Sequence, residues 1–566
     1  MSLMRRLGLR AGRSIVANIL KHIKRIAKKA FLAFKGRTRY SVELQLRDAY
    51  NSISMNYLDD HKPDEALKYI NKAIQLCEKT WGEYNKELAV SFALKARAYE
   101  LKADYDKALE YYKREMVIRE RELGEEHPDT ATTYNNMAGV YKAQGDYDKA
   151  MEYYKMALEI RERKLGKEHP DTATTYNNMA GVYKARGNYD KALEYYEMAL
   201  VIRERSLGRE HSDTATTYNN MAGIYEEQGR YDKALEYYER ALRIKERKLG
   251  KEHPDTATTY NNMAGVYKAQ GDYDKAMEYY KRALEIRERL LGEKHPDTAT
   301  TYNNMAGVYR CLRKYDDALD YYIKALKNCE IVLGMNHPDT ATAYNNVATV
   351  YHARERYEKA LEYYKIALEI YERVLGMNHP DTAATYNNMA AVYYDRQAYD
   401  TALGYYQKAL EICKQMLGNE HPDVATTYSN MAGVYEAQGQ YDKALEYYQM
   451  AFRIKERVLG GGHPSIATIY NNMAGVYQAK KNYNTALDYY ERALKIRRQA
   501  NHPDVATVYN NMAGVYEAQG QRDKALEYYS KALAICEQDL GEEHPKTKVV
   551  RNNLKLVKIL GRLEQE

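Results

Sequence analysis

Histidine and aspartate recur together at the start of a repeated phrase, and these two residue types can ligate metals or exchange protons. The phrase HPDTATTYNNMAGVY occupies residues 127–141 and returns unchanged at 169–183, 253–267 and 295–309. Each copy supplies one histidine, so neighbouring histidines fall a whole repeat apart, too far to share one metal ion. Catalysis needs one asymmetric constellation, and the chain offers no nucleophile–base pair and no glycine-rich phosphate loop. We therefore predict a non-enzymatic protein without a catalytic residue, metal site or cofactor.

The His-Pro-Asp motif has a simpler explanation as the start of a helix. Pro128 at the first helical position sacrifices no needed donor, and Asp129 in the first turn suits the positive end of the helix dipole. Ten of the eleven prolines follow a histidine in this way. We predict that each motif begins a helix.

Paired asparagines in the same phrase have the chemistry to bind a peptide. The amide of Asn136 carries a donor and an acceptor, so it can pair with the backbone of an extended segment whatever its sequence. One such bond is worth about 0.5–1.5 kcal/mol, so several in a row would be needed to hold a strand. The alternative is that Asn135 and Asn136 only bridge neighbouring helices and water. The counterparts of Asn136 in later units are Asn178, Asn220, Asn262, Asn304, Asn346, Asn388, Asn430, Asn472 and Asn511.

These residues are positioned by a regular repeat that a marker tyrosine defines. The tyrosine occurs once in each of twelve units, at equal spacing except for a shorter last step. Repeats of this length predict a solenoid, in which each unit buries its apolar face against its neighbours. The markers are Tyr57, Tyr99, Tyr141, Tyr183, Tyr225, Tyr267, Tyr309, Tyr351, Tyr393, Tyr435, Tyr477 and Tyr516.

Each unit contains two apolar stripes with helical spacing. In residues 127–168 the stripes are separated by Gln144-Gly145-Asp146 and closed by Leu165-Gly166. Both stripes contain small alanines, which allow two antiparallel helices to approach closely, and this predicts an all-α chain. The stripes consist of Tyr134, Met137, Ala138 and Tyr141, and of Ala150, Tyr154, Ala157 and Leu158.

Tyr, Met-Ala, Tyr, Gly, Tyr, Ala, Tyr and Ala at these offsets resemble the tetratricopeptide repeat. The longer unit, with LG..HPD.A in the joint and NN in the first helix, is similar to the repeats of kinesin light chain and nephrocystin-like proteins. The resemblance implies a right-handed α-solenoid of stacked antiparallel helix pairs over residues 41–545, with a C-terminal capping helix at 546–566. It also implies that first helices line a concave groove, in which Asn136 and its counterparts hold extended peptide segments of other proteins. No small-molecule substrate is expected.

A local basic cluster near two turns is a candidate patch for an acidic ligand. The resemblance supports it, because kinesin-type repeats prefer acidic peptides that carry an aromatic residue. The alternative is a solvated edge. The cluster consists of Arg310, Arg313, Lys314, Arg354 and Arg356.

Charge is concentrated in the N-terminal segment, residues 1–40. This segment holds twelve Lys or Arg and no acid, which leaves residues 41–566 at −5 of the formal net charge of +7. No basic stripe recurs along the units, so nucleic acid is not a predicted partner.

Residues 14–34 form a basic amphipathic pattern of about five helical turns. Three interpretations stay open: a helix on an anionic membrane surface, a mitochondrial targeting segment, or a cap on the first unit. The basic face consists of Lys21, Lys24, Arg25, Lys28 and Lys29.

Cysteine usage and hydropathy bear on the location of the protein. Five cysteines without CxxC spacing argue against a disulfide framework, and no apolar run is long enough to span a membrane. We expect a cytoplasmic protein. Peripheral attachment to a membrane through residues 14–34 is an alternative, and so is mitochondrial targeting.

The first functional hypothesis is a protein-interaction scaffold. One alternative is a kinesin-light-chain-like cargo adaptor, although residues 1–43 contain no heptad repeat for a coiled coil. A second alternative is a membrane-peripheral structural spacer. A third is an array without a selected ligand.

Overall fold

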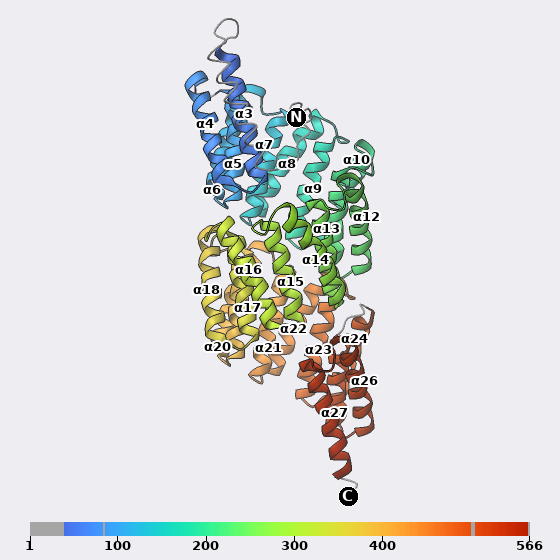
Figure 1. The fold of residues 1–566 in the computed structure, drawn as a ribbon. Helices are drawn as coiled ribbons and strands as arrows, with labels where there is room; N and C mark the ends of the chain where they lie inside the picture. The colour runs from blue at the N-terminus through green and yellow to red at the C-terminus, as the bar shows by residue number, and fades with distance from the viewer. Residues whose placement is uncertain (1–38, 83–84, 500–503, 564–566) are drawn as a thin grey trace. The chain divides into compact units, whose positions relative to one another are not determined.

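The computed structural model describes residues 39–82, 85–499 and 504–563, and the regular elements in these ranges are all helical (Figure 1). The chain divides into two compact units, Met1–Asn178 and Met179–Glu566. The boundary falls inside helix α9 (Pro170–Ala185). Both units are built from the same helical hairpin, so the all-α solenoid predicted from the repeat is confirmed.

The described part of the first unit contains three hairpins before α9. A short 3₁₀ helix, η1 (Lys86–Leu88), precedes the second hairpin. The helices are α3 (Arg39–Asp59), α4 (Pro63–Trp81), α5 (Ala89–Leu101), α6 (Tyr105–Leu123), α7 (Pro128–Ala143) and α8 (Tyr147–Lys164).

The second unit continues the array, with odd-numbered helices as the first and even-numbered helices as the second members of each hairpin. Its helices are α10 (Tyr189–Ser206), α11 (Ser212–Glu227), α12 (Tyr231–Leu249), α13 (Pro254–Gln270), α14 (Tyr273–Leu290), α15 (Pro296–Cys311), α16 (Tyr315–Val332), α17 (Pro338–Ala353), α18 (Tyr357–Val374), α19 (Pro380–Asp395), α20 (Tyr399–Leu417), α21 (Pro422–Ala437), α22 (Tyr441–Leu459), α23 (Pro464–Ala479), α24 (Tyr483–Gln499), α25 (Val505–Ala518), α26 (Arg522–Leu540) and α27 (Pro545–Leu563).

Helix α7 shows how the motif begins a helix. Pro128 is the first helical residue, as predicted. His127 is the N-cap, and its Nδ1 accepts a hydrogen bond of 3.1 Å from the backbone N–H of Asp129. The imidazole therefore satisfies one of the free N–H groups of the first turn, a role that the sequence pattern did not predict.

The turn inside the hairpin depends on a glycine in the left-handed conformation. Gly145 has a φ of +76°, which an L-residue adopts only at a cost. The backbone N–H of Asp146 donates to the carbonyl of Tyr141 at 2.9 Å, and the Asp146 side chain accepts from the N–H of Lys149 at 3.1 Å. These contacts end α7 and begin α8 within a few residues.

The two predicted apolar stripes face each other in the hairpin. Seven of the eight residues are buried, and Leu158 is half-buried. The ring of Tyr141 stacks on Tyr153 of α8, with the ring centroids 5.3 Å apart. This aromatic pair holds the hairpin together at the end that bears the turn.

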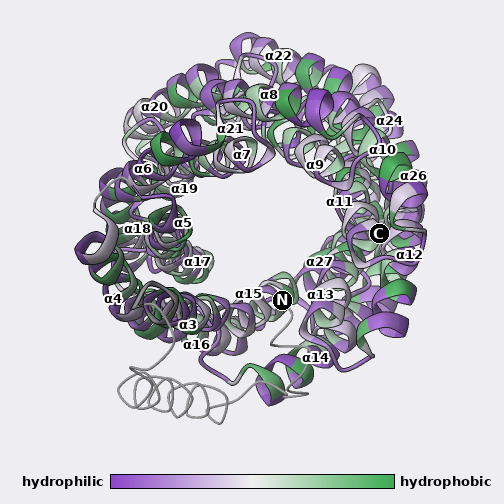
Figure 2. Cartoon of the chain, turned by 90° about the horizontal axis from the view of Figure 1, so that it is seen from above, coloured by the Kyte–Doolittle hydropathy of each residue, from purple (hydrophilic) through white to green (hydrophobic). Residues whose placement is uncertain are grey.

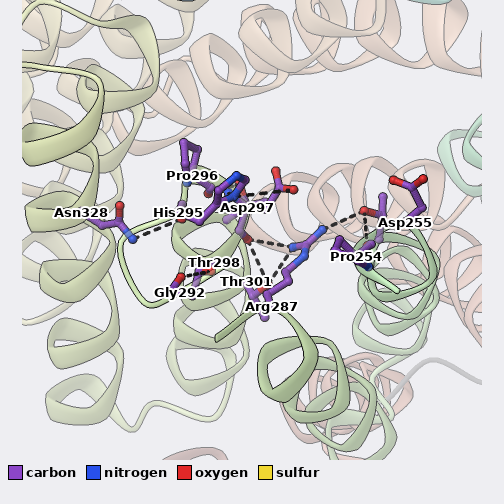
Figure 3. Close-up of polar contacts among 12 residues, drawn as sticks. Pro254, Asp255, Arg287, Gly292, His295, Pro296, Asp297, Thr298, Thr301 and Asn328 are labelled. Atoms are coloured by element: carbon purple, nitrogen blue, oxygen red, sulfur yellow. Dashed lines mark hydrogen bonds and ion pairs between the residues drawn. The ribbon is translucent and has the colours of Figure 1, made fainter. Parts of the chain in front are cut away.

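A buried arginine ties consecutive hairpins of the second unit together (Figure 3). Arg287, near the end of α14, donates to the backbone carbonyl of Asp297 and the hydroxyl of Thr301, both at 2.8 Å. It also donates to Thr258 of the preceding hairpin at 3.0 Å. One side chain that is 3% exposed therefore joins three helices. The sequence pattern did not single out this residue.

Within the second unit, first helices lie on the inner side of the superhelix and second helices on the outer side. Figure 2 shows α11, α13, α17, α19 and α21 facing the central space, with α12, α20, α22, α24 and α26 behind them. The small rotation between successive hairpins produces this curvature. First helices therefore line the concave side, as the resemblance implied.

Successive superhelical turns of the second unit dock on each other. A Cβ atom at Gly187 would lie 2.9 Å from Cδ of Pro422 and 3.0 Å from Cδ2 of His421. A Cβ atom at Gly229 would lie equally close to His463 and Pro464. The turns inside early hairpins therefore touch the helix starts of hairpins far along the chain. We call these contacts the turn docking.

The docked histidines use both ring nitrogens. Nδ1 of His421 accepts from the N–H of Asp423 at 3.1 Å, so the proton is on Nε2, and the ring hydrogen-bonds the backbone of Ala185. The side chain of His421 is 10% exposed, whereas those of the undocked His211 and His253 are 40% and 39% exposed. The docking therefore removes a capping histidine from solvent.

Candidate functional site

The predicted row of asparagines lies along the first helices, and most of its amides already donate to the first asparagine of the preceding repeat. In the first unit, Nδ2 of Asn178 donates to Oδ1 of Asn135 at 3.1 Å. Asn136 is half-buried on the same helix, α7. In the second unit the same bond recurs at 3.0–3.4 Å, from Asn262 to Asn219, Asn304 to Asn261, Asn346 to Asn303, Asn388 to Asn345, Asn511 to Asn471 and Asn553 to Asn510.

We call this row of bonds the asparagine ladder, and it supports the alternative that the paired asparagines bridge neighbouring helices. Each rung uses one N–H of the second asparagine and the oxygen of the first. The oxygen of the second asparagine and the amide nitrogen of the first take no part in the rung; they bond to each other at 3.5 Å in Asn177–Asn178 and in Asn510–Asn511. A ligand would therefore meet a partly occupied amide at most positions of the row.

The ladder is interrupted at Asn430 and Asn472. Ser429 occupies the position at which the other hairpins of the ladder have their first asparagine. Its short side chain does not accept a hydrogen bond from Asn472. One hairpin earlier, Asn387 donates to Thr427 at 3.0 Å, and its Oδ1 has no hydrogen-bond partner among the described residues. Asn472 instead donates to the hydroxyl of Tyr448.

A groove with a volume of about 680 Å³ lies at the interruption. It contains three of the predicted asparagines, Asn430, Asn472 and Asn511. It also contains tyrosines of the second helices, which the sequence pattern did not single out, and polar residues that follow the marker tyrosine. These additional lining residues include Tyr394, Tyr406, Ser429, Glu436, Tyr448, Gln478, Tyr490 and Tyr529.

Second-helix tyrosines reach the groove through gaps beside the glycines of the first helices. The hydroxyl of Tyr448 donates to Oε2 of Glu436 at 3.0 Å, and that of Tyr490 donates to Oε1 of Gln478 at 3.3 Å. Burial raises the pKa of the Glu436 carboxyl, and the hydrogen bond from Tyr448 opposes this rise. The tyrosines were predicted as core residues, and their period alone gave no sign that their hydroxyls end in the groove.

The basic cluster lies at the turns of two hairpins. Arg310 is near the end of α15, and Arg313 and Lys314 belong to the turn that follows. Arg354 pairs with Asp316 at 2.8 Å, which uses part of the cluster's charge within the array. Arg356 is the N-cap of α18. An acidic ligand at this edge stays a prediction.

The candidate basic face at Lys21, Lys24, Arg25, Lys28 and Lys29 lies outside the described residues. Within the described ranges, no helix is long and apolar enough to cross a membrane. The same ranges hold no cluster of three or more His, Cys, Asp or Glu that could bind a metal ion.

Stacked helical hairpins with a continuous inner face define an α-solenoid. The chain belongs to the tetratricopeptide repeat family. The family model matches residues 45–120, 95–163, 129–205, 171–247, 213–289, 255–331, 297–373, 339–415, 423–499 and 504–565. This membership implies a protein–protein interaction scaffold, and the family is typically non-enzymatic.

Solved structures with similar repeats cover parts of the chain. BtubC (BKLC) from P. vanneervenii is 30% identical over 41% of this chain and 91% of its own, with a TM-score of 0.34. A putative kinesin light chain with nearly identical TPR-like repeats from Podosopora anserina is 23% identical over 36% of this chain and 97% of its own, with a TM-score of 0.31. The apo form of RapI is 19% identical over 50% of this chain and 97% of its own, with a TM-score of 0.38. No curated protein matches the chain.

Proposed function

We propose that the second unit holds extended peptide segments of other proteins in the groove lined by α19, α21, α23 and α25. The observation that carries this proposal is the interruption of the asparagine ladder inside that groove. Asn430 and Asn472 lack the rung that occupies their counterparts, and Ser429 Oγ is buried without a hydrogen-bond partner among the described residues.

Backbone groups of an extended segment would satisfy these side chains. A buried polar atom without a partner costs about 1–3 kcal/mol, so a ligand that supplies the missing partner gains affinity by removing that cost. Side-chain amides serve N–H and C=O groups alike, so this part of the contact would be indifferent to peptide sequence.

Affinity capture from a cell lysate with the full chain as bait tests the proposal. The variant is Asn430→Ala with Asn472→Ala, which removes amides that are not part of the ladder. The matched control is Gln407→Ala with Glu411→Ala, an exposed pair on the outer helix α20. We expect at least one partner, quantified by mass spectrometry, to fall tenfold or more with the groove variant and to be retained by the control. Equal recovery on all three baits would contradict binding in this groove.

A further inference from the structure

Glu436 carries the only formal charge among the described residues that line the groove. Its carboxylate is partly buried and lies among tyrosines. Tyr448 donates a hydrogen bond to it, and its negative charge raises the pKa of Tyr394 and of Tyr490. A desolvated carboxylate is costly unless a cation or several hydrogen bonds compensate for it. Tyr448 supplies one such bond, and the groove supplies no cation.

The equivalent glutamate of an earlier hairpin, Glu226, has nearby cations that compensate for the burial of its charge. Glu226 of α11 receives the same tyrosine bond, from Tyr238 at 3.0 Å. It also lies between Lys184 and Lys268, whose charges favour its ionised form. At the positions of these two lysines, the hairpins on either side of Glu436 carry Tyr394 and Gln478. The cations that accompany one carboxylate are therefore missing from the other.

The backbone of Gly433, about one helical turn before Glu436, is also open. Over Gly265, a side chain from the preceding hairpin covers the glycine, because Oε1 of Glu226 lies 3.2 Å from where a Cβ atom would stand. Over Gly433, the only described atom within 4 Å of that position is the hydroxyl of Tyr448, at 3.8 Å. A peptide backbone can approach Gly433 without displacing a side chain of the preceding hairpin.

We propose that the interrupted ladder is a recognition site for a lysine or arginine side chain of an extended peptide, with Glu436 as its counter-ion. Asn430, Asn472 and Ser429 bind the adjoining backbone. This inference rests on the proposed function and names the chemistry of its ligand. A charge-assisted hydrogen bond in a partly desolvated site is about twice as strong as a neutral one, so the basic residue dominates selection. The partner is a basic segment, opposite in charge to the ligand predicted for the Arg310 cluster.

Panning of a phage-displayed library of random dodecapeptides on the immobilised full chain tests this site. The variant is Glu436→Gln, which keeps an acceptor for Tyr448 and loses the charge. The matched control is Glu226→Gln, which removes the carboxylate that already has its cations. We expect Lys or Arg to be enriched at least fivefold at one position of the peptides selected by the wild-type chain and by the control. The enrichment should disappear on Glu436→Gln.

Peptides with the same composition on the wild-type chain and Glu436→Gln would overturn the inference, as would enrichment of Asp or Glu on the wild-type chain. A second variant, Ser429→Asn, restores the missing acceptor of the ladder and should reduce recovery of the selected clones tenfold without loss of the helical circular dichroism signal. Clones lost on Ser429→Asn that show no basic preference would refute the cation site and leave groove binding standing. Failure to enrich any clone on the wild-type chain would contradict both proposals.

Discussion

At the scale of the residue, the asparagines of the ladder have two roles, because they join neighbouring hairpins and also face the groove. Ser429 replaces one acceptor, and the amide of Asn472 turns to Tyr448 instead. The helices that carry these side chains are unchanged in length by the replacement. A repeated structural bond can therefore be removed locally, and it leaves Ser429 Oγ and Asn387 Oδ1 without a hydrogen-bond partner among the described residues.

Ser429→Asn should stabilise the second unit, because the new Oδ1 can accept from Asn472. The reverse change, Asn345→Ser, should destabilise it, because Asn388 loses the acceptor it now contacts at 3.2 Å. Each change is worth about 1 kcal/mol, the net value of one hydrogen bond. Urea unfolding followed by circular dichroism measures both shifts. Shifts of the same sign would contradict a shared ladder mechanism.

The sequence predicted three of the asparagines that line the groove but not what they touch there. The period placed Asn430, Asn472 and Asn511 on the first helices, and the structure has all three in the groove. Each rung joins the second asparagine of one hairpin to the first asparagine of the preceding hairpin. That pairing depends on how far each hairpin rotates relative to the next. The rotation comes from three-dimensional packing, so the interruption at Ser429 was not visible as a functional signal.

At the scale of the element, the sequence predicted how helices begin and end, but it did not predict that the same helix ends contact each other in the turn docking. The His-Pro start and the glycine turn follow from helix-end rules. The same two features meet again in the turn docking, where Gly187 touches His421 and Pro422. The contact joins segments that are distant in the sequence, and no local pattern encodes it.

Gly187→Ala should break the turn docking locally, by forcing the turn at Gly187 away from His421 and Pro422. Its φ of +67° costs alanine about 1 kcal/mol, and the added methyl group collides with His421 and Pro422, which costs a further ~1–3 kcal/mol. Gly439→Ala is the matched control, because its φ is +75° and nothing lies within 4 Å of the new Cβ. Hydrogen–deuterium exchange at residues 421–425 should accelerate in the first variant and not in the second. Equal exchange would show that the contact does not protect this helix start.

At the scale of the second unit, the stability of the turn docking depends on pH, because two of its residues are histidines. His463 is half-buried against the carboxyl end of α11, with its ring hydrogen-bonded to the backbone of Glu227 and with Lys455 nearby. Burial, with the Lys455 charge as a smaller contribution, lowers the pKa of His463 to about 4. Burial also lowers the pKa of His421. Both rings are neutral while docked at neutral pH.

Acidification should therefore weaken the second unit. Between the unfolded pKa of about 6.5 and the folded pKa of about 4, the unfolded chain binds a proton at His463 that the folded chain does not, so stability is lost as pH falls through this window. The loss from His463 alone is about 3 kcal/mol. His463→Asn keeps a capping acceptor and cannot titrate, so its urea midpoint should fall less between pH 7 and pH 4.5. His253→Asn, at an undocked cap, should behave as the wild-type chain does; an identical pH dependence in all three proteins would refute the mechanism.

The shorter step before Tyr516 shows how the docked turns accommodate a change in repeat length. Gly187 meets His421 and Gly229 meets His463, and these two pairs have the same separation in the sequence. Arg313 influences the pKa of His544 across a separation that is shorter by the length of the deletion in the last step. A turn inside a hairpin therefore still lies near the histidine of the next superhelical turn, although the two are fewer residues apart in the sequence.

The turn docking decides how a partner reaches the inner face. Where Gly187 contacts His421 and Gly229 contacts His463, successive superhelical turns of the second unit touch each other, so a peptide cannot pass between them at these two positions. A flexible tail can be threaded in by its free end. A segment flanked on both sides by folded domains can enter there only after the turns have parted, so the accessibility of a partner's chain end becomes part of its recognition.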